Sequence, residues 1–227
     1  MEDRIQTMHS VSFLSDFSDE ELRIVEKCLS LRIQIFEKRD RILEASEPAA
    51  TMAVILQGRV LEEYTDVFGN RNIVAERHRG DALAIDYACM QMPRLLTTYI
   101  AAERSKILFL NSGRIFGDCN KNCNIRSKML ENLLKLTVSE LLSQSRKIKC
   151  MSQRNTREKL IAFLSYSAQQ NGKSSFSISF SRQELADYLC LNRSAVSKEL
   201  CLMRDEGLLR FHRNHFELLI GDDDRVS

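Results

Sequence analysis

Four side chains near the carboxyl end of the chain share one face of a predicted helix, and their chemistry suits hydrogen bonding to base edges. They are Arg193, Ser194, Ser197 and Lys198. An arginine can donate two parallel hydrogen bonds to guanine, a serine hydroxyl can donate or accept, and a lysine is a compact cation. A face this small can enter a DNA major groove, so we expect these four residues to contact bases.

The flanking sequence predicts two short helices joined by a tight turn. Ser181 stands three residues before Glu184, a capping-box spacing that predicts a helix over residues 182–190. Asn192 is a favoured N-cap for a second helix that begins at Arg193. Apolar residues spaced four and three apart then face away from the polar side; they are Val196, Leu200 and Met203.

A hairpin is predicted after the second helix. Gly207 supplies the left-handed residue that commonly ends a helix, and apolar residues then alternate over residues 209–220. The tip of this hairpin is basic and suits phosphate or minor-groove contact. We expect phosphate contacts from His212, Arg213 and Asn214.

Charge is distributed unevenly along the chain. Residues 146–213 hold 13 Lys and Arg against 6 Asp and Glu, whereas residues 1–145 hold 19 against 21. The basic excess coincides with the predicted helices and hairpin, as expected of a surface that attracts a polyanion. For any single residue, the alternative is a solvated charge on a small amphipathic subdomain. The combination of two helices, a hairpin and a basic excess favours DNA binding.

Length and composition indicate a folded protein of two domains. The 227 residues are 44% hydrophobic, which is enough to build a core. No apolar run approaches the roughly 20 residues that span a bilayer, and the first residues lack the basic-then-apolar order of a signal peptide. Seven cysteines, an odd number, then indicate reduced thiols. We expect a cytoplasmic protein without membrane contact.

A long helix is predicted from Asn124 to Met151, because this stretch contains neither Pro nor Gly. An apolar stripe with spacings of four and three is typical of helices that pack along each other. We expect a two-fold dimer interface, which would hold two reading helices about one DNA turn apart; a buried helix in a monomer is the alternative. The expected interface residues are Leu130, Leu134, Thr137, Leu141 and Ile148. A second stripe predicts packing against the first domain; it comprises Ile125, Met129, Leu133 and Leu136.

The first part of the chain changes from helical to alternating periodicity. Ser18 and the three acidic residues after it predict a capped helix. Short strands with Gly-centred turns every ~8 to 12 residues then predict an antiparallel barrel or jelly roll, which can enclose a small ligand. The fold class is α+β, with a β-roll over residues 1–123, a dimerisation helix over 124–151 and a winged helix-turn-helix over 152–227.

The order of these segments makes the chain resemble the Crp/Fnr family of bacterial transcription regulators. The resemblance rests on VILQGRV, DVFGNRNIV and RGD in the roll, the long helix, and SRQELADYL followed by CLNRSAVSKEL. It spans nearly the whole chain, and the carboxy-terminal motif is its specific part. It implies a homodimer that binds a near-palindromic site in double-stranded DNA and recruits or blocks RNA polymerase.

The resemblance also implies roles for individual residues. Arg193, Ser194 and Lys198 stand where family members contact bases, and Ser181 and Arg182 stand where they contact phosphate. Many members have Glu at the place of Ser194, where it accepts a hydrogen bond from cytosine N4. We therefore expect a half-site that differs from the family's commonest one.

The phosphate-binding segment of the family's cyclic-nucleotide receptors is degenerate in this chain. Those members carry Gly-Glu and then Arg-Ser or Arg-Thr, because a phosphodiester anion needs a guanidinium. The corresponding places hold Ala84-Ile85 and Leu96-Thr97, and Arg94 lies two residues away. Burying an anion without its partner is costly, so we expect no cyclic nucleotide.

The loss of charge favours an apolar or aromatic small molecule as the effector. Our hypothesis for its pocket comprises Ile85, Leu96, Thr97, Leu130 and Leu134. Redox sensing at Cys119 or Cys123, an iron–sulfur cluster and a haem held by His78 are alternatives that the residue spacing supports less well. We expect no metal and no resident cofactor.

Two other classes of protein are alternatives. A cupin-type small-molecule or metal enzyme would need paired histidines in the roll, and His212 and His215 belong to the hairpin instead. No phosphate loop, nucleophile elbow or pair of catalytic carboxylates is present, so we expect no enzyme. A protein-interaction module with a vestigial DNA reader is the remaining alternative, which the salt dependence of DNA binding would distinguish.

Overall fold

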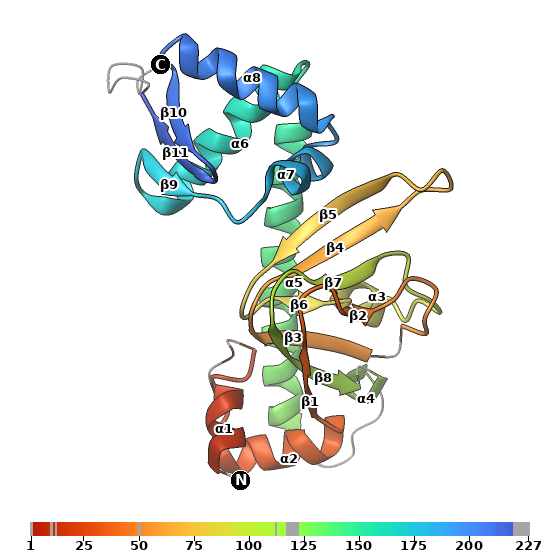
Figure 1. The fold of residues 1–227 in the computed structure, drawn as a ribbon. Coiled ribbons are helices and arrows are strands. Elements are labelled where there is room, and N and C mark those ends of the chain that lie inside the picture. The colour runs from red at the N-terminus through yellow and green to blue at the C-terminus, as the bar shows by residue number, and fades with distance from the viewer. Residues whose placement is uncertain are drawn as a thin grey trace. The chain divides into compact units, whose positions relative to one another are not determined.

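The computed structural model describes residues 2–9, 11, 13–49, 51–111, 113–116 and 123–219, and it divides into two compact units. The first unit comprises residues 1–142 and the second residues 143–227, with the boundary inside one long helix (Figure 1). Among the described helices, none combines the length and apolar character of a membrane span.

The first unit begins with the helices α1 (Glu2–His9) and α2 (Asp19–Leu29). Ser18 Oγ accepts from the backbone N–H of Glu21, and the Glu21 carboxylate accepts from the backbone N–H of Ser18 at 2.8 Å. The predicted cap is confirmed. Ser30 then ends α2 in the left-handed conformation, with φ of 53°.

The strands of the first unit form two antiparallel sheets. Their orders are β1-β8-β3-β6 and β2-β7-β4-β5. The strands are β1 (Arg32–Phe36), β2 (Arg41–Leu43), β3 (Thr51–Gln57), β4 (Val60–Thr65), β5 (Arg71–Arg77), β6 (Ala82–Leu83), β7 (Thr98–Ala101) and β8 (Ser105–Asn111). The short helices are α3 (Ile85–Cys89) and α4 (Gly113–Phe116). The predicted antiparallel roll is confirmed.

Strand β3 is apolar at consecutive positions because both of its faces are buried. Ala53 and Ile55 lie in the core between the two sheets, whereas Met52 and Val54 lie in a second core with the helices. The alternation of period two thus supplies one face to each core. Residues of the same parity on β8 follow the same division.

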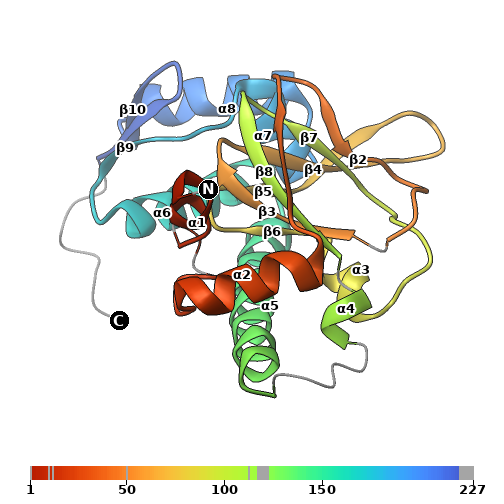
Figure 2. The ribbon, with the colours of Figure 1, turned by 90° about the horizontal axis from the view of Figure 1, so that it is seen from below.

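Helix α5 runs from Cys123 to Met151 and covers the second core with its first half. Ile125, Met129 and Leu133 are buried there, as the second apolar stripe predicts, and Leu136 packs at the edge. Figures 1 and 2 show α2 crossing this half of α5, where Lys128 Nζ lies 2.8 Å from Glu21 Oε1.

Besides the end of α5, the second unit contains three helices and a three-stranded antiparallel sheet within its described residues. They are α6 (Thr156–Asn171), β9 (Ser175–Ser177), α7 (Arg182–Leu189), α8 (Arg193–Asp205), β10 (Leu209–His212) and β11 (His215–Leu218), with sheet order β10-β11-β9. This is a winged helix-turn-helix, and it confirms the predicted fold class. Its core is formed by buried side chains from every element, including Leu160, Phe176, Leu185, Val196, Leu200 and Phe216.

Candidate nucleic-acid interface

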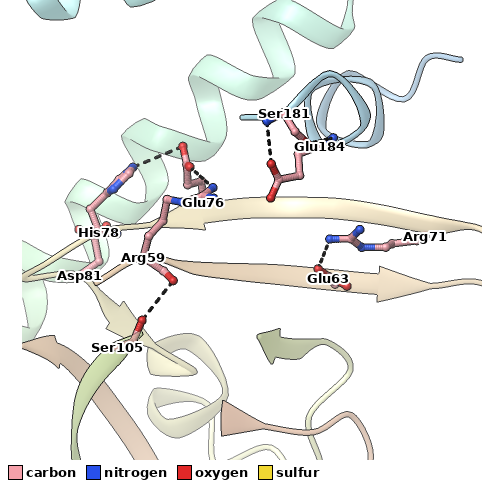
Figure 3. A network of polar contacts seen from close by, with 9 residues as sticks. All are labelled: Arg59, Glu63, Arg71, Glu76, His78, Asp81, Ser105, Ser181 and Glu184. Carbon is pink, nitrogen blue, oxygen red and sulfur yellow. Dashed lines mark hydrogen bonds and ion pairs between the residues drawn. The ribbon is translucent and has the colours of Figure 1, made fainter. Parts of the chain in front are cut away.

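A capping box fixes the start of α7, and a left-handed residue at its other end begins the turn to α8. The backbone N–H of Ser181 donates to Glu184 Oε2 at 2.7 Å, and the backbone N–H of Glu184 donates to Ser181 Oγ at 3.2 Å (Figure 3). The predicted capping box is therefore present. Cys190 adopts the left-handed conformation, with φ of 53°, so the chain turns at once toward α8.

Helix α8 presents the predicted polar face to solvent. Val196, Leu200 and Met203 are buried, and their spacing turns the opposite side of the helix outward. Arg193, Ser194 and Lys198 are exposed and Ser197 is half-buried. Within the described part of the chain, Arg193 and Lys198 form no ion pair, so both cations remain available to a ligand.

The start of α8 is open as well. Asn192 occupies the N-cap, but its side chain makes no capping hydrogen bond. The Asn192 amide and the first backbone N–H groups of α8 therefore remain available to a ligand beside Arg193. Helix N-termini carry partial positive charge, which adds to the attraction for phosphate.

The hairpin β10–β11 forms a wing with an aromatic inner face. Phe176 and Phe216 stack with ring centres 6.4 Å apart, and Phe211 lies 5.9 Å from Phe216. The tip turns at Arg213, whose φ is 53°. His212 and Arg213 are exposed and Asn214 is half-buried, so all three predicted phosphate contacts lie at the tip of the wing.

Arg182 has a different setting from the outward cations. Its guanidinium lies 5.2 Å and 4.9 Å from the ring centres of Phe211 and Phe216, and its Nη2 donates to the Arg213 carbonyl at 2.6 Å. Burial lowers the pKa of Arg182. The side chain therefore joins α7 to the wing tip, and its predicted phosphate contact stays a prediction.

Arg157 joins α6 to α8. Its Nε donates to Glu199 Oε1 at 2.6 Å, and its two Nη groups donate to the Glu206 carboxylate at 2.6 and 2.8 Å. These bonds raise the pKa of Arg157 and lower that of Glu206. A bidentate pair fixes orientation as well as distance, so the recognition helix is held at a defined angle on its support.

The roll carries a buried group of charged residues that sequence reasoning missed. Arg77 is 6% exposed, and its Nη2 donates to Glu62 on β4 and to Glu140 on α5, both at 2.6 Å. Glu62 also accepts from the Thr97 hydroxyl at 3.0 Å. Burial raises the pKa of nearby Tyr99 well above its usual range. No local signal in the sequence links residue 140 to residue 77, since the pairing requires the folded roll.

The hypothesised effector-pocket residues lie in different surroundings. Ile85 is buried in the helix-side core, whereas Leu96 is 62% exposed. Thr97 is buried and bonded to Glu62, and Leu130 and Leu134 point to solvent from α5. Arg94 donates to the Ser46 carbonyl at 2.7 Å, so its guanidinium is engaged in a loop.

The outer stripe of α5 is exposed in the single chain. Leu134, Leu141 and Ile148 are 64%, 67% and 64% exposed, at intervals of seven residues. Leu130 is also exposed, and the Thr137 hydroxyl donates to the Leu133 carbonyl at 2.9 Å. The predicted dimer-interface residues thus share an apolar and solvated surface.

The alternative sensors rest on cysteines and on His78. No group of three or more potential metal ligands occurs among them. Burial raises the pKa values of Cys89 and Cys150, which keeps these thiols protonated. Cys119 lies outside the described residues. His78 Nε2 lies 3.4 Å from Glu76, which also pairs with Arg59 (Figure 3).

Known proteins share both the fold and the reading domain. Residues 158–223 match the Crp-like helix-turn-helix domain. Electron transport regulator A of Shewanella oneidensis is 22% identical over 178 residues, covering 76% of this chain and 69% of that protein. The structure of FixK2 from Bradyrhizobium japonicum matches with a TM-score of 0.67 at 19% identity, over 83% of this chain and 92% of that chain. The c-di-GMP-responsive global regulator CLP of Xanthomonas campestris matches with a TM-score of 0.71 at 13% identity, over 88% and 96%.

Residues 158–223 therefore belong to the Crp-like helix-turn-helix domains. The β-roll, the long helix and the winged helix-turn-helix together give the chain the fold of FixK2 and CLP.

Proposed function

We propose that the chain acts as a homodimer that binds a near-palindromic operator through α8 and the wing of each protomer. This proposal rests on the exposed polar face of α8, whose cations are available to a ligand. Arg193 and Lys198 are exposed and unpaired within the described residues, so binding DNA breaks no internal ion pair. In this role Arg193 donates to a guanine, and Ser194, Ser197 and Lys198 complete the base contacts.

The phosphate contacts of the proposed complex come from the wing tip and the cap of α7. His212, Arg213 and Asn214 approach the backbone from the wing, and Ser181 is exposed at the start of α7. The Ser181 oxygen accepts the capping bond, which leaves its hydroxyl proton for a phosphate. Arg182 acts in this scheme by positioning the wing tip.

The exposed stripe of α5 supports dimerisation. A row of large apolar side chains seven residues apart is the seam of a two-stranded coiled coil, and a second copy of the helix would remove it from water. Each buried Å² of apolar surface contributes about 25 cal/mol. Leu134→Asp with Leu141→Asp should give a monomer in sedimentation equilibrium. Ser139→Asp, at an exposed position of α5 outside this stripe, should stay dimeric.

The effector proposed for the roll is a small molecule other than a cyclic nucleotide. Two glutamates, Glu62 and Glu140, share the single guanidinium of Arg77, so a phosphodiester anion would meet net negative charge there. Thermal-shift measurements with cAMP, cGMP and cyclic di-GMP should show no stabilisation. A clear shift with any of them would overturn this part of the proposal.

Selection of bound fragments from random duplex DNA tests the proposed function directly. A two-fold symmetric consensus is expected, and affinity should fall steeply between about 50 and 200 mM salt. The selection should be repeated with and without reductant to test thiol control. We propose RNA polymerase as a further partner. We also propose that the protein acts in the cytoplasm and has no enzymatic activity. Recovery of fragments without a shared motif would contradict the proposal.

A further inference from the structure

The outer face of the wing sheet carries a hydrogen-bonded group that the contacts above do not use. Strand alternation turns the phenylalanines inward and leaves a polar face on the other side. That face is formed by Ser175 and Ser177 on β9, His215 and Glu217 on β11, and Arg210 and His212 on β10.

His215 spans two serines on the neighbouring strand. Its Nε2 lies 3.0 Å from Ser175 Oγ, and its Nδ1 lies 3.0 Å from Ser177 Oγ. The two serines are alternate residues of β9, and both are exposed. The ring therefore has a fixed position along the edge of the sheet, with both nitrogens bonded to hydroxyl groups.

The proton count of this group depends on the charge of the ring. In neutral His215 one nitrogen donates and the other must accept, so one serine proton points into the ring and one remains free. In the imidazolium both nitrogens donate, and both serine protons are released to the outside. Protonation thus adds one positive charge and one outward hydroxyl donor at the same place.

We propose that His215, Ser175 and Ser177 form an anion site that binds a DNA backbone phosphodiester, and that His215 takes up a proton when the site is filled. This inference rests on the proposed function. A phosphodiester offers two charged oxygens to the two hydroxyl donors, and its negative charge stabilises the imidazolium.

The surrounding charges favour an anion at this position. His212 lies opposite His215 on β10. Glu217, the nearest carboxylate on the face, has Arg210 at 3.8 Å, and Arg213 stands at the wing tip. Lys173 is exposed two residues before β9. Cations therefore outnumber carboxylates around the group.

Equilibrium binding to the selected operator duplex, measured by fluorescence anisotropy between about pH 5.5 and 8.5, tests the proposal. The wild-type dimer should bind about fivefold more tightly at the acidic end, with a salt slope steeper by about 0.9 for one added phosphate. His215→Gln and the double change Ser175→Ala with Ser177→Ala should remove this pH dependence.

His78→Gln is the matched control, because it removes an exposed imidazole of the roll and leaves the serine-bridged ring. It should retain the pH dependence. Equal pH dependence in the wild type and His215→Gln, with both proteins folded by circular dichroism, would overturn the site and leave the proposed function standing. Loss of operator binding at every pH in the wild type would instead contradict the proposed function itself.

Discussion

The β-roll and the recognition helix use arginine in opposite ways. In the roll, Arg77 is buried between Glu62 and Glu140, and these carboxylates neutralise its charge inside the protein. On α8, Arg193 is exposed and has no ion-pair partner among the described residues. The first arginine supports the fold at the cost of desolvation, whereas the second is kept available for a ligand. The same residue type thus marks structure in one unit and recognition in the other.

The largest expected effect comes from removing the charge of Arg77. Arg77→Met leaves the buried Glu62 and the half-buried Glu140 without this cation, which should lower the free energy of unfolding by about 3–5 kcal/mol. Urea denaturation of the full chain measures this value. A loss below about 1 kcal/mol would show that the buried pair is not needed for the fold.

An exposed ion pair of the same unit provides the control. Arg41 pairs with Glu44, and both side chains are well solvated. Arg41→Met should change the free energy of unfolding by less than about 1 kcal/mol, because solvent screens such pairs.

Arg182 is an exception to this comparison, because it belongs to the second unit but is partly buried. Arg182→Lys cannot reproduce the contacts with Phe211 and Phe216, so we expect about 1–2 kcal/mol less stability in the wing. Amide hydrogen exchange of β10 and β11 should accelerate accordingly. Arg154→Lys is the control, because Arg154 is an exposed arginine of the same unit that precedes α6. Equal exchange in the two variants would argue against Arg182 as the wing support.

The capping boxes of α2 and α7 compare the two units directly. Ser18→Ala and Ser181→Ala should each lower the free energy of unfolding of their own unit by about 1 kcal/mol. Only Ser181→Ala should also weaken operator binding, because only that hydroxyl lies in the proposed interface. Equal DNA affinity in both variants would remove Ser181 from the phosphate contacts.

The sequence predicted what depends on local spacing. Ser181 and Glu184 are three residues apart, and Val196, Leu200 and Met203 repeat at helical intervals, so the reading helices could be assigned before the structure. The side of α8 that carries Arg193 followed from the same periodicity.

Contacts between distant residues could not be predicted in this way. Glu140 reaches Arg77 across 63 residues, and His215 reaches Ser175 across 40. For Arg182 the family resemblance predicts a phosphate contact and gives no information on contacts with the wing. The burial of Arg182 depends on the phenylalanines of a wing about thirty residues later, and no pattern of period two or 3.6 reports such a contact.

The smallest expected effect concerns His78 in the roll. Its hydrogen bond with Glu76 raises the pKa of His78, so the pair stabilises the fold below the ordinary imidazole range and loses this effect as pH rises through the raised pKa. The side chain is exposed and screened. His78→Gln should cost about 0.5 kcal/mol near pH 5.5 and almost nothing near pH 9, as measured by urea denaturation. A larger cost at the alkaline end would contradict this sign.

The central claim, that α8 reads bases through an uncommitted arginine, is tested most directly by repeating the duplex selection with Arg193→Ala. The consensus should lose its preference at one base pair in each half-site, and affinity for the wild-type operator should fall by about 1–3 kcal/mol. The rest of the motif and its symmetry should persist. An unchanged consensus with unchanged affinity would contradict the assignment of α8 as the recognition helix.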